Sequence, residues 1–145
     1  HPVPDAAGVA ATTRLLALLD TLEDGDFVLA LISGGGSALL TAPAGGITLE
    51  ELQQVNSGLL ASGAAIDQMN VVRKHLSRAT GGQLAAAAYP ARMLSLMISD
   101  IPGDDPAMIA SGPTVGDAST PADAQAILTR LGLELPVSKE GCPKV

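Results

Sequence analysis

The sequence predicts an α/β fold in which a parallel sheet carries helices on both faces. Two short runs, residues 27–32 and 93–98, are almost entirely apolar and are bounded by turn-forming residues. Such runs are typical of strands that are buried on both faces of a parallel sheet. Helical patterns alternate with these strands along the chain, and this alternation favours parallel pairing.

The first half of the chain is predicted to contain a helix, a strand, a glycine-rich loop and a second helix. Leucines recur at helical spacing over residues 8–22, which predicts a helix there. The strand at 27–32 runs directly into the loop Ser33–Ser37. Thr48 and Glu51 form a capping box, so the next helix is expected to begin at Thr48.

The second half continues the alternation of helices and a strand. Asp67 is expected to cap a helix that carries a basic group, and a short helix is expected over residues 84–88. A loop rich in Asp, Pro and Gly follows the second strand. Thr120, with Pro121 at the first helical position, predicts a last helix, which Gly132 ends.

Composition limits the classes of protein to consider. The chain has 145 residues, the size of one ordinary domain, and a formal net charge of -7. That charge disfavours nucleic acid and anionic membranes as partners. The longest apolar run is shorter than the roughly 18 residues of a membrane span, so we expect no transmembrane helix. The single cysteine, Cys142, fits a reducing compartment, and we expect a cytoplasmic protein.

The two ends of the chain suggest how it is organised. It starts with His1 rather than Met and shows no signal-peptide pattern, so we expect a fragment of a longer protein. Residues 1–132 are expected to form part of one domain. Residues 133–145 lack periodicity, and we expect a tail that is disordered or foreign to the domain.

The loop after the first strand is the first candidate site. Three consecutive glycines leave the backbone open, so several N–H groups can approach one anion. The loop has no lysine and matches neither the Walker A nor the G-x-G-x-x-G motif, so a plain turn remains the alternative. A serine hydrolase is poorly supported, because Leu39 replaces the second glycine of a nucleophile elbow. The candidate phosphate-binding residues are Ser33, Gly34, Gly35, Gly36 and Ser37.

A basic segment of the third expected helix is the second candidate. On a helix, Asn70, Arg73, Lys74 and Ser77 share one face, at spacings of three and four residues. Asn, Arg and Lys together could orient and neutralise a carboxylate or a phosphate. A solvated basic face is the alternative, although the cluster stands out in an acidic chain.

The loop after the second strand is the third candidate. Ser99 and Asp100 follow that strand directly, and ligands of parallel sheets bind beyond the carboxyl ends of the strands. Asp100 could bind magnesium or take a proton from an attacking hydroxyl. Asp104 and Asp105 lie in the same loop, where turn formation is the alternative. Residues 111–114 form a further turn that could fold back over the same edge.

Read together, these motifs resemble class II glycerate kinases, also called glycerate 2-kinases, some of which carry the name hydroxypyruvate reductase. The motifs occur here in the same order as in that family, and the resemblance runs from His1 to about Leu131. The segments that carry it are His1–Asp5, Ile32–Leu40, Met69–Ser77, Ser99–Pro106 and Ile109–Thr114.

The resemblance implies that the γ-phosphoryl group of ATP is transferred, with magnesium, to a hydroxyl of D-glycerate, giving a phosphoglycerate and favouring the 2-phosphate. It implies a Rossmann-like N-terminal domain, of which this chain is a part, a smaller C-terminal domain, and an active site between them. A catalytic lysine near the family's N-terminus and the basic residues of its C-terminal domain are not in this sequence. We therefore expect the chain alone to be inactive.

With this resemblance, we predict that Lys74, Arg73 and Asp100 are catalytic. Asn70 and Ser99 join the glycine loop as binding residues, and Asp100 and Asp105 are the magnesium ligands. ATP and D-glycerate are the expected partners, and a homodimer is the candidate assembly. One alternative is an NAD(P)H-dependent hydroxypyruvate reductase, against which the missing dinucleotide fingerprint argues. The other is a non-catalytic anion-binding domain.

Overall fold

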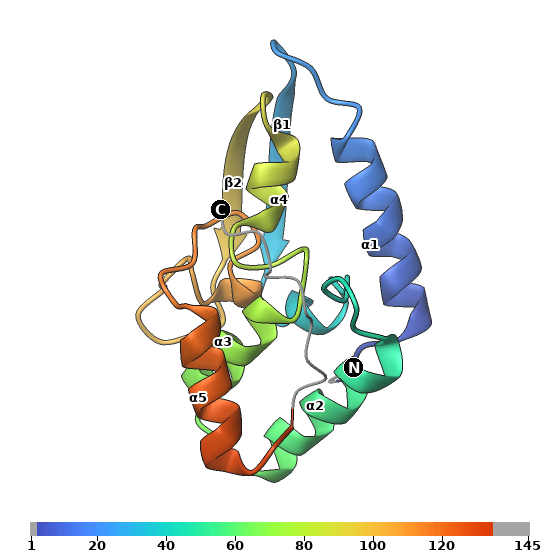
Figure 1. Cartoon of the computed structure of the whole chain (residues 1–145). Helices are drawn as coiled ribbons and strands as arrows, with labels where there is room; N and C mark the ends of the chain where they lie inside the picture. The colour runs from blue at the N-terminus through green and yellow to red at the C-terminus, as the bar shows by residue number, and fades with distance from the viewer. Residues whose placement is uncertain (1–2, 135–145) are drawn as a thin grey trace.

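The structure is a computed structural model that describes residues 3–134 of the chain. Five α-helices, two strands and two short 3-10 helices are found in these residues (Figure 1). In chain order they are α1 (Ala6–Leu19), β1 (Phe27–Ser33), η1 (Gly36–Ala38), α2 (Leu49–Ala61), α3 (Ile66–His75), α4 (Gln83–Ala88), β2 (Arg92–Ile98), η2 (Ile109–Ser111) and α5 (Pro121–Leu131).

The two strands form a parallel sheet, as the sequence predicts. Phe27 pairs with Arg92 at one end of the sheet, and Ser33 pairs with Ile98 at the other. Because the strands run in the same direction, the loops that follow them leave the sheet at one common edge. In Figure 1 both arrows point toward the half of the molecule that contains α2 and α3. The mixed α/β class is therefore confirmed.

One face of the sheet is covered by α1 and α4. Val28 of β1 and Met93 of β2 point to this face, where they pack against a small core that contains Leu19, Leu84 and Ala88. These side chains alternate along each strand with side chains of the opposite face, because successive residues of a strand point in opposite directions.

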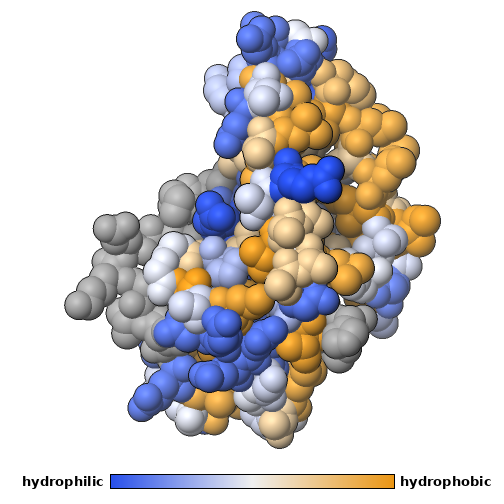
Figure 2. Space-filling view, turned by 90° about the vertical axis from the view of Figure 1, so that its right-hand side faces the viewer, coloured by the Kyte–Doolittle hydropathy of each residue, from blue (hydrophilic) through white to orange (hydrophobic). Residues whose placement is uncertain are grey.

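The opposite face of the sheet is open within residues 3–134. Phe27 is 63% exposed there, Leu31 is 73% exposed and Ile98 is 75% exposed. The apolar runs predict burial on both faces, whereas here no described element covers the second face. Figure 2 shows hydrophobic residues gathered along one side of the upper part of the molecule, which contains the sheet.

A second core holds together the helices beyond the carboxyl ends of the strands. Leu59 of α2, Val72 of α3 and Leu128 of α5 are completely buried in it. The same cluster contains Leu52, Val55, Leu76 and Ala124. Burying a Leu or Val side chain contributes roughly 1.5–3 kcal/mol, so this core fixes α2, α3 and α5 relative to one another.

The predicted helix caps are confirmed at two of three positions. Thr48 caps α2 and Thr120 caps α5, each in a reciprocal capping box. The prediction for Asp67 was wrong, because Ala65 is the N-cap of α3 and Asp67 lies in its first turn. An acidic residue is favourable both at the N-cap and in the first turn, because both positions lie at the positive end of the helix dipole. The presence of Asp67 therefore does not show at which of these positions it lies.

Helix α1 begins and ends earlier than its leucine pattern predicts. Asp5 caps it, since its carboxylate accepts a hydrogen bond from the Gly8 amide at 2.8 Å. The helix ends at Leu19, yet Leu22 still packs against the core under the sheet. An apolar residue after a helix can fill the same core as the helix itself, and the leucine pattern does not show where the helix ends.

The predicted tail is described only in its first two residues. The amide of Leu133 donates to the Leu128 carbonyl at 2.9 Å, and the Leu133 side chain packs against the core of α2, α3 and α5. Residues 135–145 lie outside the described part of the chain. None of the helices in residues 3–134 is long and apolar enough to cross a membrane.

Candidate functional site

The glycine loop turns the chain sharply from β1 into the 3-10 helix η1. Gly35 has a φ of 76°, in the left-handed region, which side chains other than glycine rarely adopt. The Leu39 and Leu40 amides both donate to the Gly36 carbonyl, at 3.0 and 2.9 Å. The loop is thus a compact turn at the carboxyl end of β1.

Gly34 and Asp100 lie in direct contact across the edge of the sheet. A Cβ atom placed on Gly34 would lie 2.0 Å from the Asp100 Cγ, far inside van der Waals contact. The Gly34 amide donates to the Ile98 carbonyl at 3.1 Å, which extends the parallel pairing by one residue. The structure therefore brings together the first and third candidate segments, as their positions at the strand ends imply.

The two adjacent cations of α3, Arg73 and Lys74, point in different directions. Arg73 lines a pocket, whereas Lys74 is buried and its Nζ lies 3.8 Å from the Asp117 Oδ1. Consecutive helical residues point about 100° apart, so two adjacent cations need not serve one site. Asn70 is also buried, and its Oδ1 accepts a hydrogen bond from the Ser111 hydroxyl at 3.4 Å.

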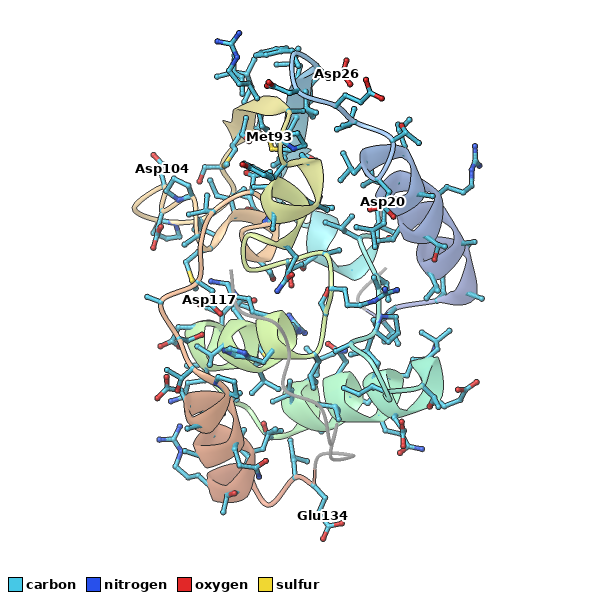
Figure 3. All side chains as sticks on the ribbon, turned by 45° about the horizontal axis from the view of Figure 1, so that its top comes forward. Asp20, Asp26, Met93, Asp104, Asp117 and Glu134 are labelled. Atoms are coloured by element: carbon cyan, nitrogen blue, oxygen red, sulfur yellow. The ribbon has the colours of Figure 1, made fainter. Side chains whose placement is uncertain are left out.

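Asp117 organises a polar cluster beside α3 (Figure 3). Its Oδ2 lies 3.4 Å from the His75 Nε2, and both its carboxylate oxygens accept from the Ser119 hydroxyl at 2.8 Å. The His75 Nε2 also lies 3.1 Å from the Ser119 Oγ. A catalytic Ser-His-Asp triad uses both nitrogens of the imidazole, whereas here one nitrogen faces both partners. The cluster therefore fixes α3 to the segment before α5.

The pocket beside Arg73 has a volume of about 480 Å³ and lies between the glycine loop, α2 and α3. Its apolar part is lined by Leu52, Leu60, Ile66 and Met69, and its polar part by Gly35, Ser37, Arg73, Ser77, Thr80 and Ser111. Among residues 3–134, Arg73 is the only cationic side chain that lines the pocket, and no carboxylate of these residues lines it. The sequence predicts a site at Arg73, whereas the residues of α2 that line this pocket belong to no sequence motif.

Arg73 is held in the pocket by Asn56. The Arg73 Nε donates to the Asn56 Oδ1 at 2.9 Å, and the Asn56 Nδ2 donates to the Leu52 carbonyl at 2.9 Å. Burial lowers the pKa of Arg73 below its ordinary value, because desolvation disfavours the charged guanidinium. Arginine nevertheless stays protonated in proteins, so the pocket holds a positive charge.

Two pocket residues are unusual in their backbone or hydrogen bonding. Ser111 has a φ of 61° and follows Ala110 with a φ of 50°, both in the left-handed region. The Gly81 amide donates to the Ser111 carbonyl at 3.0 Å, which holds this turn in place. Thr80 is 3% exposed, and its hydroxyl has no hydrogen-bond partner among the described residues. Neither Thr80 nor Asn56 belongs to a pattern that sequence reasoning could have used.

The turn at residues 111–114 folds back onto the sheet, as the sequence suggests. The Ser95 hydroxyl of β2 donates to the Thr114 Oγ1 at 2.9 Å. This contact and the one between Ser111 and Asn70 place the turn between the sheet and α3.

The remaining acidic loop residues act in turns. The Asp105 Oδ1 accepts from the Ala107 amide at 3.0 Å, and Asp104 has a φ of 51° on a loop that projects from the molecule (Figure 3). The Ser99 hydroxyl bonds to the carbonyl and the amide of Ile101, at 3.2 and 3.3 Å. Residues 3–134 contain no group of three or more His, Cys, Asp or Glu side chains that could hold a metal.

A glycine loop and an aspartate at one edge of a parallel sheet, beside a pocket with an arginine, define an α/β protein with a candidate anion site. The chain belongs to the family described as domain of unknown function DUF4147, which matches residues 1–141.

Relatives of this chain carry two kinds of name. It is 48% identical to the D-glycerate 2-kinase of Thermotoga maritima over 134 residues, which are 92% of this chain and 32% of that protein. It is 56% identical to an Agrobacterium vitis protein provisionally named a hydroxypyruvate reductase, over 95% of this chain and 32% of that protein.

A solved structure supports the same relationship. The crystal structure of glycerate kinase from Thermotoga maritima matches with a TM-score of 0.90 and 44% identity, over 100% of this chain and 36% of that one. The chain thus spans about a third of the length of these relatives. The resemblance to glycerate kinases that the motifs indicate is confirmed.

Proposed function

We propose that this chain is part of a glycerate kinase, which transfers the γ-phosphoryl group of ATP to a hydroxyl of D-glycerate. The contact between Gly34 and Asp100 carries the proposal, because it places a carboxylate beside an open backbone loop at the carboxyl ends of parallel strands. Relatives named glycerate kinase and D-glycerate 2-kinase support the same reaction.

Phosphoryl transfer depends mainly on positioning and on neutralising charge. In the proposed reaction, Asp100 accepts the proton of the attacking hydroxyl or holds magnesium. The amides and hydroxyls of Ser33–Ser37 bind phosphate oxygens. Arg73 contributes positive charge from the pocket, and Lys74 acts on the site through the position of α3. Asn70 orients the turn at residues 111–114 through Ser111, and Ser99 orients the loop that carries Asp100 through its bonds to Ile101.

Magnesium fits Asp100 better than it fits the rest of its loop. Proteins bind this ion with one or two carboxylates, together with substrate phosphates and water. The Asp100 carboxylate is exposed and lies against the glycine loop, whereas the Asp105 Oδ1 is engaged by a backbone amide. When bound, magnesium would neutralise charge on the transferred phosphoryl group. ATP, magnesium, a cytoplasmic location and a homodimer all belong to this proposal.

The proposal is tested by following ADP release from ATP and D-glycerate with the whole protein. Substituting Asp100→Asn removes the basic carboxylate at almost constant size, so we expect kcat to fall by about 10²–10⁴-fold. The matched control is Asp104→Asn in the same loop, since Asn tolerates the left-handed backbone. Turnover by Asp100→Asn at the level of the Asp104→Asn control would refute the assigned role.

The same preparation tests the two alternatives. Oxidation of NADH or NADPH on addition of hydroxypyruvate would favour a reductase, the name given to the Agrobacterium vitis relative. Binding of phosphate or ATP without ADP release in the presence of D-glycerate would favour a non-catalytic anion-binding domain. We expect ADP release with D-glycerate and no oxidation of the nicotinamide.

A further inference from the structure

The described part of the chain gives the pocket beside Arg73 one positive charge and no negative one. Neither terminal nitrogen of Arg73 has a hydrogen-bond or ion-pair partner within residues 3–134, while its Nε is fixed by Asn56. A guanidinium presents parallel N–H groups whose geometry matches a carboxylate. Leaving a half-buried cation without an acidic partner is costly, and an anionic ligand removes that cost.

Thr80 adds a second, independent indication of a ligand. Thr80 lines the same pocket, and its buried hydroxyl has no hydrogen-bond partner among the described residues. A buried hydroxyl without a partner costs about 1–3 kcal/mol. A ligand with oxygen atoms would supply the missing hydrogen bond.

The charge of the pocket selects the kind of anion. One guanidinium balances one carboxylate, whereas the triphosphate of a nucleotide carries several negative charges that a single arginine leaves uncompensated. The polar part of the pocket is also lined by hydroxyl-bearing residues, which suit a ligand that itself carries hydroxyls: Ser37, Ser77, Thr80 and Ser111. The apolar part offers such a ligand no polar partner, so the ligand belongs at the polar end.

We propose that Arg73 and Thr80 form the subsite that binds the carboxylate of a small hydroxy acid, and that the glycine loop and Asp100 serve the transferred phosphoryl group. The identity of that acid as D-glycerate rests on the proposed function. Gly35 and Ser37 line the pocket and also belong to the glycine loop. An acid bound by its carboxylate at Arg73 therefore lies next to the loop at the strand ends.

Calorimetric titration of the whole protein with D-glycerate, without nucleotide, tests the subsite directly. Arg73→Met keeps the length of the side chain and removes its charge, so we expect the affinity for D-glycerate to fall about 10- to 100-fold. Thr80→Val keeps the shape and removes the hydroxyl, and we expect a loss of about 3- to 10-fold. The matched control is Arg78→Met, since Arg78 is exposed and its Nε donates to the Pro43 carbonyl.

Binding and turnover, measured separately, distinguish a failure of the subsite from a failure of the proposed function. Arg73-dependent binding of D-glycerate without any ADP release would support the subsite and refute the kinase. ADP release by Arg73→Met with an unchanged KM for D-glycerate would refute the subsite and keep the kinase. A loss of affinity for ATP or inorganic phosphate alone in Arg73→Met would show a phosphate site instead. Absence of any Arg73-dependent binding of D-glycerate would also overturn the proposal, and Thr80→Val decides the matter if Arg73→Met does not fold.

Discussion

At the scale of single residues, Gly34 and Asp100 constrain each other. The Asp100 carboxylate occupies the space that a side chain at position 34 would need. Gly34 is not among the residues with a positive φ, so its backbone would accept alanine. Glycine is required here for the close approach of Asp100, in contrast to Gly35, which is required for its left-handed backbone.

This contact predicts a coupled effect of two substitutions. Gly34→Ala should push the Asp100 carboxylate away and lower kcat by about tenfold or more, since small displacements of catalytic groups are costly. The free energy of unfolding should fall by no more than about 1 kcal/mol, because Asp100 is exposed and can rotate into solvent. ADP release and urea unfolding of the whole protein measure the two effects.

The double variant supplies the control. Once Asp100→Ala has removed the carboxylate, adding Gly34→Ala should change kcat little, which is the signature of two residues that act through one contact. Independent, multiplicative losses in the double variant would show that Gly34 matters for another reason.

The sequence predicted where Gly34 and Asp100 lie in the fold, but it did not predict which side chains contact Lys74 and Arg73. The position of Asp100 and Gly34 follows from where two strands end, which apolar runs reveal. The direction of Lys74 does not, because the acid that binds it, Asp117, comes from a segment without any recognisable pattern. Thr80 and Asn56 become functional candidates only when folding brings α2 and α3 around one pocket.

At the scale of elements, α1 is joined to the segment after the glycine loop by one buried hydrogen bond. The Thr41 amide donates to the Thr12 Oγ1 at 2.9 Å, and both residues are 2% exposed. Gly8 allows the same close approach, since a Cβ there would lie 2.8 Å from the Leu39 carbonyl oxygen. The first helix therefore supports the loop that lines the pocket.

Replacing Thr12 with Val should measure that support. The substitution removes this buried hydrogen bond and leaves the Thr41 amide only its contact with the Leu39 carbonyl at 3.1 Å. We therefore expect a loss of about 1 kcal/mol in the free energy of unfolding. Thr13→Val is the matched control, because Thr13 is exposed and bonds only within α1; its effect should stay within about 0.5 kcal/mol. Equal losses in the two variants would refute the structural role of Thr12.

Sequence patterns located the elements but not all of their ends. Thr48 and Thr120 start their helices because each finds an acidic residue three positions later, a signal that is entirely local. The end of α1 depends on how Leu22 packs against the sheet, which is a tertiary effect. Local signals can therefore be read from the chain, and packing signals cannot.

At the scale of the whole molecule, the open face of the sheet is the largest departure from the sequence prediction. The apolar strands predicted cover on both sides, yet Phe27, Leu31 and Ile98 are largely exposed. Apolar side chains on both faces of a strand indicate that both faces are buried in the folded protein. Within residues 3–134, only one face of the sheet is covered, by α1 and α4. The fold class could be predicted because the alternation of strands and helices lies within the chain itself.

An open apolar face predicts self-association of the 145-residue chain when it is produced alone, because exposed apolar patches promote aggregation. Leu31→Lys places a charge in the middle of that face and should lower light scattering several-fold at equal concentration. Leu18→Lys is the matched control, since Leu18 is 61% exposed but lies on α1. Equal scattering by the two variants would show that association arises elsewhere.

The parallel pairing of β1 with β2 also bears on how the chain folds. The two strands are separated by three α-helices along the sequence, so their contact closes a long loop and is expected to form late. During synthesis β1 leaves the ribosome before β2, so β1 has no strand to pair with, and its apolar side chains stay exposed, until β2 has also been synthesised. Asp100 follows β2 in the sequence, so the contact between Asp100 and Gly34 can form only after the two strands have paired.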